Sequence, residues 1–160
     1  MKNKNLSFMT QAAMIAAIYV VLTYIFAPFS FGEVQVRISE ALTILPIFTP
    51  AAIPGLFAGC LIGNILGGAI LPDIVFGSIA TLIGAFFTWK LREQKPVVAT
   101  FPPIISNIII VPFVLRYGYG VTLPIPFMML TVGIGEVISC TVLGLVVYGA
   151  LKKYKSTLFR

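Results

Sequence analysis

Two polar side chains stand inside long apolar stretches of this sequence and could bind a ligand there. Glu136 occurs in TVGIGEVISC, where glycines flank it and Ser139 follows at helical spacing, and Asn107 lies in the middle of the preceding apolar stretch. On neighbouring helices, a carboxylate and an amide at similar depth could face one cavity. A charged residue within a span costs up to about 2.5–3.5 kcal/mol, so Glu136 indicates a function. The alternative is an interhelical hydrogen bond that closes the bundle.

A second group of charged residues lies in the segment FGEVQVRISEALTILP. Glu33, Arg37 and Glu40 are expected at the outer surface, where a second helix begins, and could contact a substrate. A structural role fits equally well, because Arg37 and Glu40 could form an ion pair with each other. Ser39 is predicted to be the N-cap of that helix, and Glu40 in the first turn suits the helix dipole.

The remaining polar and sulfur-containing residues of the apolar stretches have simpler explanations. Asn64 could hydrogen-bond to a neighbouring helix or line the cavity. Asp73 follows Pro72 and is predicted to cap the N-terminus of a helix. Cys60 and Cys140 lie far apart in apolar runs, which favours small buried hydrophobic side chains over a disulfide or a metal site.

The composition is that of an integral membrane protein. Of the 160 residues, 59% are apolar and 10% are charged, and the mean hydropathy is +1.04. Soluble domains carry about 25% charged residues, and a soluble domain of this size could not bury so much apolar surface. A disordered tail, a disulfide scaffold and a nucleic-acid-binding protein are excluded on the same grounds.

The sequence shows no catalytic or cofactor-binding pattern. It contains no histidine and no GxxxxGK[ST] loop, so it cannot hydrolyse ATP by that route. A His/Cys cluster and a nucleophile–base pair are also absent. We therefore expect neither enzyme activity nor a cofactor or metal.

Hydropathy and chain breaks divide the sequence into six predicted helices within one integral membrane domain, residues 1–160. A spanning helix needs about 20 apolar residues, with about 17 tolerated. Residues 9–26 meet this and are followed by no small-x-small cleavage site, so we expect a retained span rather than a signal peptide. Breaks are expected at Thr49-Pro50 and within residues 67–72. The predicted helices cover residues 9–26, 39–48, 51–66, 73–91, 97–115 and 123–151.

The basic residues test this number of helices. With six alternating spans, nine of the eleven fall on one side of the membrane, and Arg37 and Arg116 fall on the other. The positive-inside rule then makes both termini cytoplasmic in a multi-pass protein of the cell membrane. The nine are Lys2, Lys4, Lys90, Arg92, Lys95, Lys152, Lys153, Lys155 and Arg160.

Glycine recurs every four residues in the third predicted helix. Faces of small residues let two backbones approach closely in a membrane, which favours packing between helices of this chain. The glycines of this face are Gly55, Gly59, Gly63 and Gly67.

The first predicted helix offers alanines one turn apart, in two registers. Ala12 with Ala16 forms one register, and Ala13 with Ala17 forms the other. They could pack inward or present a smooth groove to a second membrane protein, and spacing alone favours inward packing.

Several ordered segments resemble the QueT family across nearly the whole chain. These segments are VQVRISEALTILP, TPAAIPGLFAGCLIGN, PDIVFGSIATL and TVGIGEVISC. Members of this family are small integral membrane proteins assigned as substrate-binding (S) components of energy-coupling factor (ECF) transporters for queuosine precursors. The resemblance implies a transport subunit, with ATP hydrolysed by two separate ATPases.

The resemblance to the wider group of S components also implies an architecture. It implies six helices with cytoplasmic termini, and an outward-facing pocket roofed by the loops after helices one, three and five. It further implies that an alanine-rich face of the first helix docks on the membrane scaffold of the transporter. The resemblance therefore favours docking on a partner over inward packing for the alanines Ala12, Ala13, Ala16 and Ala17. It does not indicate which of the two registers docks.

The implied ligand is a 7-deazaguanine, such as the aminomethyl form or queuine. Its guanine-like edge carries N–H donors that one carboxylate can accept in a bidentate manner, and Glu136 is the first candidate. Asn107 could serve the O6 side of the ring or another part of its rim. A pocket built around such hydrogen bonds rejects analogues that lack them, because its buried partners would stay unpaired.

Other side chains could complete the pocket. The cationic aminomethyl arm could be received by a second carboxylate, either Glu40 or Glu33. Phe31 and Phe76 could stack on the flat ring or form a wall beside it.

Two other functions remain open on the sequence. The nearest is an S component for another vitamin or a purine, which the ligand that co-purifies with the protein would distinguish. The other is a non-transport membrane assembly protein in which Glu136 only braces the bundle, and it predicts no saturable binding of a small molecule.

Overall fold

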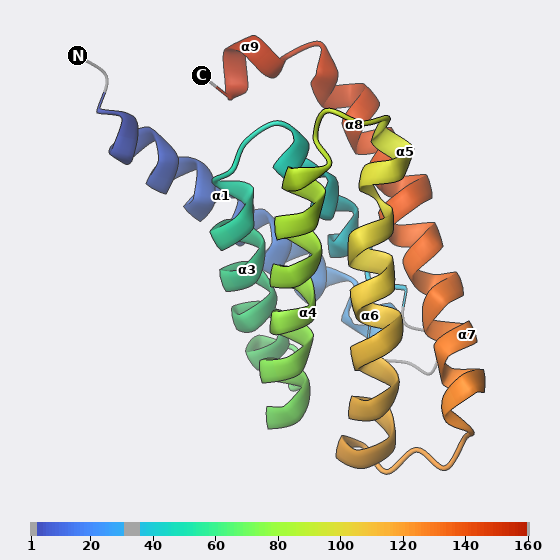
Figure 1. The fold of residues 1–160 in the computed structure, drawn as a ribbon. Helices are drawn as coiled ribbons and strands as arrows, with labels where there is room; N and C mark the ends of the chain where they lie inside the picture. Colours follow the sequence, from blue (N-terminus) through green and yellow to red (C-terminus); the bar gives the residue numbers. More distant parts are fainter. Residues whose placement is uncertain (1–2, 31–35, 160) are drawn as a thin grey trace.

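The computed structural model describes residues 3–30 and 36–159, and these form helices joined by short loops, without a β-strand. Phe31 and Glu33, both predicted as site residues, lie outside the described residues. Figure 1 shows the arrangement of the helices. They are α1 (Lys4–Ile25), α2 (Ala27–Ser30), η1 (Ile38–Ile47), α3 (Ala52–Leu66), α4 (Leu71–Lys90), α5 (Pro96–Ala99), α6 (Phe101–Phe113), η2 (Val114–Gly118), α7 (Ile125–Glu136), η3 (Val137–Leu143), α8 (Gly144–Lys152) and α9 (Lys155–Leu158).

Four helical stretches within the described residues are long and apolar enough to cross a membrane. They are Lys4–Ile25, Leu71–Lys90, Pro96–Gly118 and Ile125–Lys152. Two shorter apolar helices, Ile38–Ile47 and Ala52–Leu66, accompany them. The all-helical class predicted from composition is thereby confirmed.

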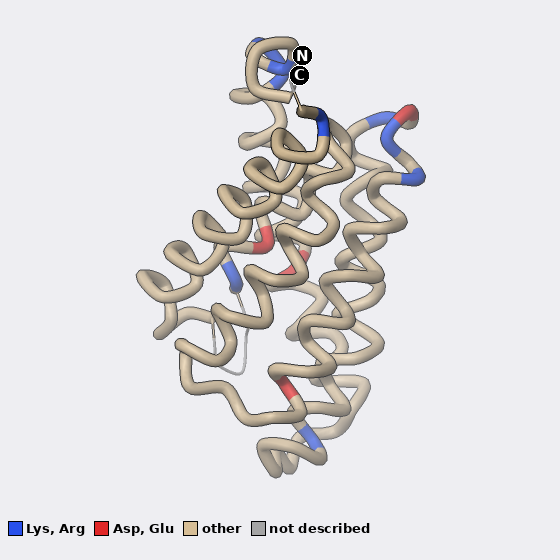
Figure 2. The backbone as a smooth tube through the Cα atoms, turned by 90° about the vertical axis from the view of Figure 1, so that its left-hand side faces the viewer, with Lys and Arg blue, Asp and Glu red and all other residues tan. Residues whose placement is uncertain are grey.

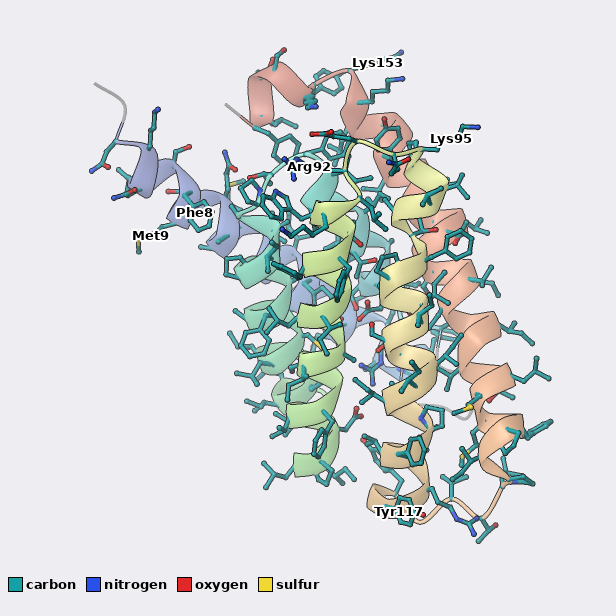
Figure 3. The ribbon with its side chains drawn as sticks, in the orientation of Figure 1. Phe8, Met9, Arg92, Lys95, Tyr117 and Lys153 are labelled. Atoms are coloured by element: carbon teal, nitrogen blue, oxygen red, sulfur yellow. The ribbon has the colours of Figure 1, made fainter. Side chains whose placement is uncertain are left out.

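Positive charge gathers at one end of the bundle. Both termini and the loop after α4 lie at this end (Figure 1), and most lysine and arginine residues of the described chain are found there (Figure 2). Arg92, Lys95 and Lys153 mark this end, whereas Tyr117 lies at the opposite end (Figure 3). The segments between the two ends can therefore face hydrocarbon without exposing charge.

The glycine face of α3 packs directly on α1. A Cβ atom on Gly55 would lie 2.7 Å from the backbone oxygen of Ala12, and one on Gly59 would lie 2.8 Å from the Cβ of Tyr19 and 3.1 Å from the Cα of Ala16. No side chain fits between helices this close, so glycine sets the distance between α1 and α3. Ala12 and Ala16 are half-buried in this contact, whereas Ala13 and Ala17 are exposed.

The same face ends where α3 ends. A Cβ on Gly63 would meet the Thr23 side chain at 3.3 Å, and Gly67 is the C-cap residue of α3. Gly68 then adopts a left-handed conformation with φ of +78°, which favours glycine because it has no Cβ. This turn leads the chain into α4.

The short second helix differs in form from the α-helix predicted over residues 39–48. It is a 3-10 helix over Ile38–Ile47 with Arg37 as its N-cap residue, and every residue from Ser39 to Pro46 is buried. The prediction that Ser39 is the N-cap is therefore wrong. Its hydroxyl instead accepts a hydrogen bond from the Thr23 hydroxyl at 2.9 Å, which ties η1 to α1.

Candidate functional site

Polar residues of α1 and α4 point into the centre of the bundle. In α1, the buried residues Ile15, Tyr19 and Thr23 follow one another at four-residue spacing. In α4, Asp73 and Thr81 share a buried face at the same kind of spacing. Residues four apart lie on one face of a helix, so each helix directs its polar groups toward η1.

Glu40 of η1 is held at this centre by two hydroxyl groups. Its Oε1 accepts a hydrogen bond from the Tyr19 hydroxyl at 2.5 Å, and the Thr81 hydroxyl lies 3.4 Å from the same oxygen. Its Oε2 is buried and finds no hydrogen-bond partner among the described residues. A buried acceptor without a partner is destabilising, and a ligand that donates a hydrogen bond would supply one.

Glu136 reaches the same region from the last residue of α7. It is buried, and its Oε2 lies 3.2 Å from the Cys140 thiol, which donates to it. The Asn107 side chain of α6 also interacts with this carboxylate. The structure thus brings together Glu136 and Asn107, the two residues that the sequence predicts to face one cavity.

A change of helix type follows Glu136. The segment η3 is a π-helix that begins at Val137 and contains Ser139 and Cys140. π-Helical segments are rare and occur frequently at functional sites. The Ser139 hydroxyl is buried and, within the described part of the chain, finds no hydrogen-bond partner, so it too can serve a ligand.

Glu40, Glu136 and Cys140 converge on one point. One oxygen of each carboxylate and the Cys140 sulfur all lie within 4.8 Å of one another. These atoms can accept hydrogen bonds from a ligand, attract a positive charge, or, by their type, coordinate an ion such as Zn²⁺. We refer to Glu40 and Glu136 as the carboxylate pair.

Arg37 forms an ion pair with Asp73 rather than with Glu40. Its Nη2 lies 3.4 Å from both carboxylate oxygens of Asp73, and both side chains are buried. The suggested pairing of Arg37 with Glu40 is therefore wrong. The ion pair forms with Asp73 because α4 packs against η1. This packing brings the first turn of α4, which contains Asp73, to the start of η1.

The prediction that Asp73 caps a helix is also wrong. Ile70 is the N-cap residue of α4, and Asp73 lies in its first turn. The Tyr119 hydroxyl donates to its Oδ2 at 2.9 Å, and the Asn64 amide donates to its backbone oxygen at 3.3 Å. Asp73 therefore ties the loop after η2 and helix α3 to the start of α4.

Gly77 makes room for these contacts. A Cβ atom there would lie 2.9 Å from the Oδ1 of Asp73 and 3.3 Å from the Nδ2 of Asn64.

Burial and the neighbouring Asp73 carboxylate raise the pKa of Tyr119 to about 12, so its phenol stays protonated and remains a donor at neutral pH.

Replacing Tyr119 by phenylalanine should lower the thermal stability of the protein in detergent. The change removes the hydrogen bond to a buried, charged Asp73, and such bonds contribute about 1.5–3 kcal/mol. Tyr117→Phe is the matched control, because Tyr117 is 79% exposed and its ring, stacked on Phe113, is kept. Equal melting temperatures for the two variants would contradict a structural role for the Tyr119 hydroxyl.

Phe76 lies outside the cluster, contrary to the prediction that it lines the pocket. It is 52% exposed and borders an apolar groove of about 500 Å³ together with Ile109 and Phe113. The buried face of α4 is the one that carries Asp73 and Thr81, and Phe76 falls on the neighbouring face.

Tyr19, Thr81 and Tyr119 belong to the site although no sequence motif marks them. A signal exists for two of them: Tyr19 precedes Thr23 by four residues, and Thr81 follows Asp73 by eight. Polar residues repeated on one face of an apolar helix indicate the face turned toward the protein interior. Tyr119 lies in a loop and offers no such pattern.

Comparison with known proteins shows that the chain matches a family model. The family model described as QueT transporter matches residues 9–153. The chain belongs to the QueT family. A QueT chain with four helices that are long and apolar enough to cross a membrane is a multi-pass membrane protein.

One curated QueT relative is the Queuosine precursor transporter QueT of Lactococcus lactis subsp. cremoris (strain MG1363). The two chains are 33% identical over 84 residues, which is 51% of this chain and 48% of the relative. The match thus spans about half the length of that relative. No solved structure matches this QueT chain.

Proposed function

We propose that this chain is the substrate-binding membrane subunit of an ATP-driven ECF-type transporter and binds a 7-deazaguanine precursor of queuosine from outside. The observation that carries the proposal is the buried carboxylate pair, in which Oε2 of Glu40 has no partner among the described residues. Membership of the QueT family supports the class of ligand.

The site suits the polar edge of such a ring. The guanine-like edge presents N–H donors, which a carboxylate accepts in charge-assisted hydrogen bonds. Glu136 takes this edge, and Asn107 beside it serves the rim with its mixed donor and acceptor groups. Glu40 and Ser139 supply further polar atoms.

The proposed topology has six membrane segments and cytoplasmic termini. The segments are α1, η1, α3, α4, the stretch from α5 to η2, and the stretch from α7 to α8. The gathering of basic residues at the end that carries both termini supports a cytoplasmic position for that end (Figure 2). The ligand then reaches the site from the opposite end, where Tyr119 meets Asp73.

The proposed partners are a membrane scaffold and two ATPases, with α1 docking on the scaffold. Of the two alanine registers, Ala13 with Ala17 is exposed, whereas Ala12 with Ala16 lies against the glycines of α3. The exposed register is free to meet a second membrane protein through close helix contact, so we assign docking to Ala13 and Ala17.

Ligand binding by the purified protein tests the proposed function. Mass spectrometry of co-purified small molecules and isothermal titration with 7-aminomethyl-7-deazaguanine should reveal one saturable site. Competition with guanine and with unrelated vitamins separates this ligand class from others. Absence of saturable binding would reject a substrate-binding subunit and favour an assembly protein.

Leucine at Ala13 or Ala17 should leave ligand binding intact and reduce uptake by cells at least tenfold. The bulk would hold the scaffold helix away from α1 without touching the interior of the bundle. Leucine at Ala150, an exposed alanine of α8, is the matched control and should leave uptake unchanged. Normal uptake by both Ala13→Leu and Ala17→Leu would contradict docking by this register.

A further inference from the structure

We propose that a groove between α4 and α6 binds an anionic phospholipid, with an acyl chain lying in the groove and the phosphate beside Lys90. Lys90 is the last residue of α4 and precedes the basic loop of Arg92 and Lys95 at one end of the bundle (Figure 3). We call this groove the Lys90 groove. It is separate from the carboxylate pair, so the inference does not depend on the ligand of that pair.

One face of each helix forms a wall of the Lys90 groove. On α4, Ile83, Phe87 and Lys90 follow one another at spacings of four and three residues, and on α6, Ile105 and Ile109 are four apart. Residues at these spacings share one face of a helix. The two helices lie side by side (Figure 1), and the groove between these faces has a volume of about 450 Å³.

The walls of the groove present hydrocarbon rather than hydrogen-bonding groups. The Ser106 hydroxyl, which also lines the groove, donates to the backbone oxygen of Ala80 at 3.0 Å and is therefore already used within the protein. Ile105 and Phe87 are about half exposed. Within the described chain these walls are thus open to a covering apolar molecule, which in a membrane is supplied by lipid.

The length of the groove suits a lipid of one leaflet. Its lining on α6 extends from Pro102 to Ile110, which is about 12 Å at a rise of 1.5 Å per residue. One leaflet contributes about 15 Å, half of the thickness of the hydrocarbon core. An acyl chain whose headgroup lies at the Lys90 end therefore fills the groove before it reaches the middle of the bilayer.

Lys90 supplies a positive charge at the mouth of the groove. Its Nζ lies 5.5 Å from the ring centroid of Phe86 and 5.4 Å from that of Trp89, and such cation–π contacts hold an ammonium group in place. Lys90 forms no ion pair with a carboxylate of the described chain. Its charge is therefore available to an anion.

A second cation lies at the same aromatic ring. The Arg92 guanidinium is 4.5 Å from the ring centroid of Trp89. Its Nη2 also lies 3.8 Å from a carboxylate oxygen of Glu93, whose side chain is 84% exposed, and exposed pairs of this kind are weak. Basic pockets between membrane helices bind anionic headgroups, and tryptophan is enriched at the membrane interface. The chemistry of the mouth therefore matches a lipid phosphate.

A neighbouring groove provides an internal comparison. The groove of about 500 Å³ beside Phe76 shares Ile109 with the Lys90 groove and continues to Tyr117, and its described lining carries no charged side chain. It can hold an acyl chain but offers no group that selects a headgroup. Selectivity for an anionic lipid is therefore expected from the Lys90 groove alone of these two.

A second copy of this chain fits the Lys90 groove less well. In a two-fold dimer the same surface patch of both copies meets at the interface, so two Lys90 side chains would come together at one depth and repel each other. A phospholipid brings an acyl chain and a negative charge in one molecule. The groove is also separated from the proposed docking face on α1, because α1 packs on α3 and α3 packs on α4.

Native mass spectrometry of the full chain tests the headgroup preference. The protein is released from detergent in the presence of phosphatidylglycerol or of phosphatidylethanolamine with the same acyl chains. The wild-type protein should retain about fivefold more phosphatidylglycerol, and Lys90→Gln should remove this preference, because one basic residue near a membrane surface has an effect of this size. Lys153→Gln, at the same basic end (Figure 3), is the matched control and should keep the preference.

A second pair of variants tests the groove itself. Tryptophan at Ile105, which is 53% exposed, would fill the groove, so Ile105→Trp should lower retention of phosphatidylglycerol about fivefold. Val146→Trp is the matched control, because Val146 of α8 is 66% exposed and lies outside the groove. Glycerol phosphate carries the phosphate without a chain and, at the same concentration as the lipid, should not displace it.

Four results would overturn the inference. They are equal retention of the two lipids by the wild-type protein, an unchanged preference in Lys90→Gln, displacement of the lipid by glycerol phosphate, and a dimer that Ile105→Trp dissociates, which would show that a second copy occupies the groove. Melting temperatures in detergent establish that each variant is folded. If Ile105→Trp does not fold, the comparison of headgroups with Lys90→Gln decides the matter.

Discussion

Replacing Glu136 by glutamine should weaken binding of 7-aminomethyl-7-deazaguanine by about 10- to 150-fold. A hydrogen bond to a charged group contributes about 1.5–3 kcal/mol, and glutamine presents one acceptor where the carboxylate presents two. Isothermal titration with protein in detergent measures the effect, and Glu93→Gln, at a side chain that is 84% exposed, is the control.

This prediction separates a ligand contact from a brace between helices. If Glu136 only holds the bundle together through Cys140 and Asn107, Glu136→Gln should lower the melting temperature and leave the affinity for the aminomethyl compound unchanged. That outcome would remove Glu136 from the site.

Replacing Gly59 by alanine should lower the stability of the protein by about 1–3 kcal/mol, the usual cost of overpacking. The new Cβ would lie 2.8 Å from the Cβ of Tyr19 and 3.1 Å from the Cα of Ala16, so α1 and α3 must move apart. Tyr19 holds Oε1 of Glu40. Affinity for the aminomethyl compound should therefore fall together with the melting temperature.

The matched control for this packing prediction is Gly149→Ala. A Cβ at Gly149, within α8, meets no atom within 4 Å, and alanine is the better helix former by about 1 kcal/mol. Gly149→Ala should therefore keep or raise the melting temperature. If Gly59→Ala behaves like Gly149→Ala, the α1–α3 contact is not as close as we describe.

The class of fold could be predicted because composition alone determines it. A chain with 59% apolar and 10% charged residues has to place helices in lipid, and glycines and prolines mark most of the helix ends. The 3-10 form of η1 and the π-helix η3 could not be predicted. Their hydrophobic pattern is close to that of an α-helix, and the choice depends on packing against neighbouring helices.

The candidate site could be predicted where a polar residue is unexpected in its surroundings. Glu136 and Asn107 stand out in apolar runs, and the structure brings them together. The local sequence around Asp73 predicts a helix cap. Nothing in that local sequence indicates the contacts of Asp73 with Arg37 and Tyr119. The orientation of Phe76 depends on the rotation of α4 in the bundle, which no local sequence pattern fixes.

The register of the alanines depends on a second helix. Ala12, Ala13, Ala16 and Ala17 are equivalent in spacing, so α1 alone cannot distinguish an inward face from an outward one. The glycines of α3 lie against Ala12 and Ala16, and this contact leaves the other two alanines exposed.

The contacts of Asp73 with Arg37 and Tyr119 join segments that are distant in the sequence: the start of η1, the start of α4 and the loop after η2. On the route of entry that we propose, a ligand would have to separate these segments, and they would close again behind it. Stronger contacts would then slow association and dissociation by the same factor, so their strength would cancel from the dissociation constant. These contacts would therefore set how long a bound ligand resides without changing its equilibrium affinity.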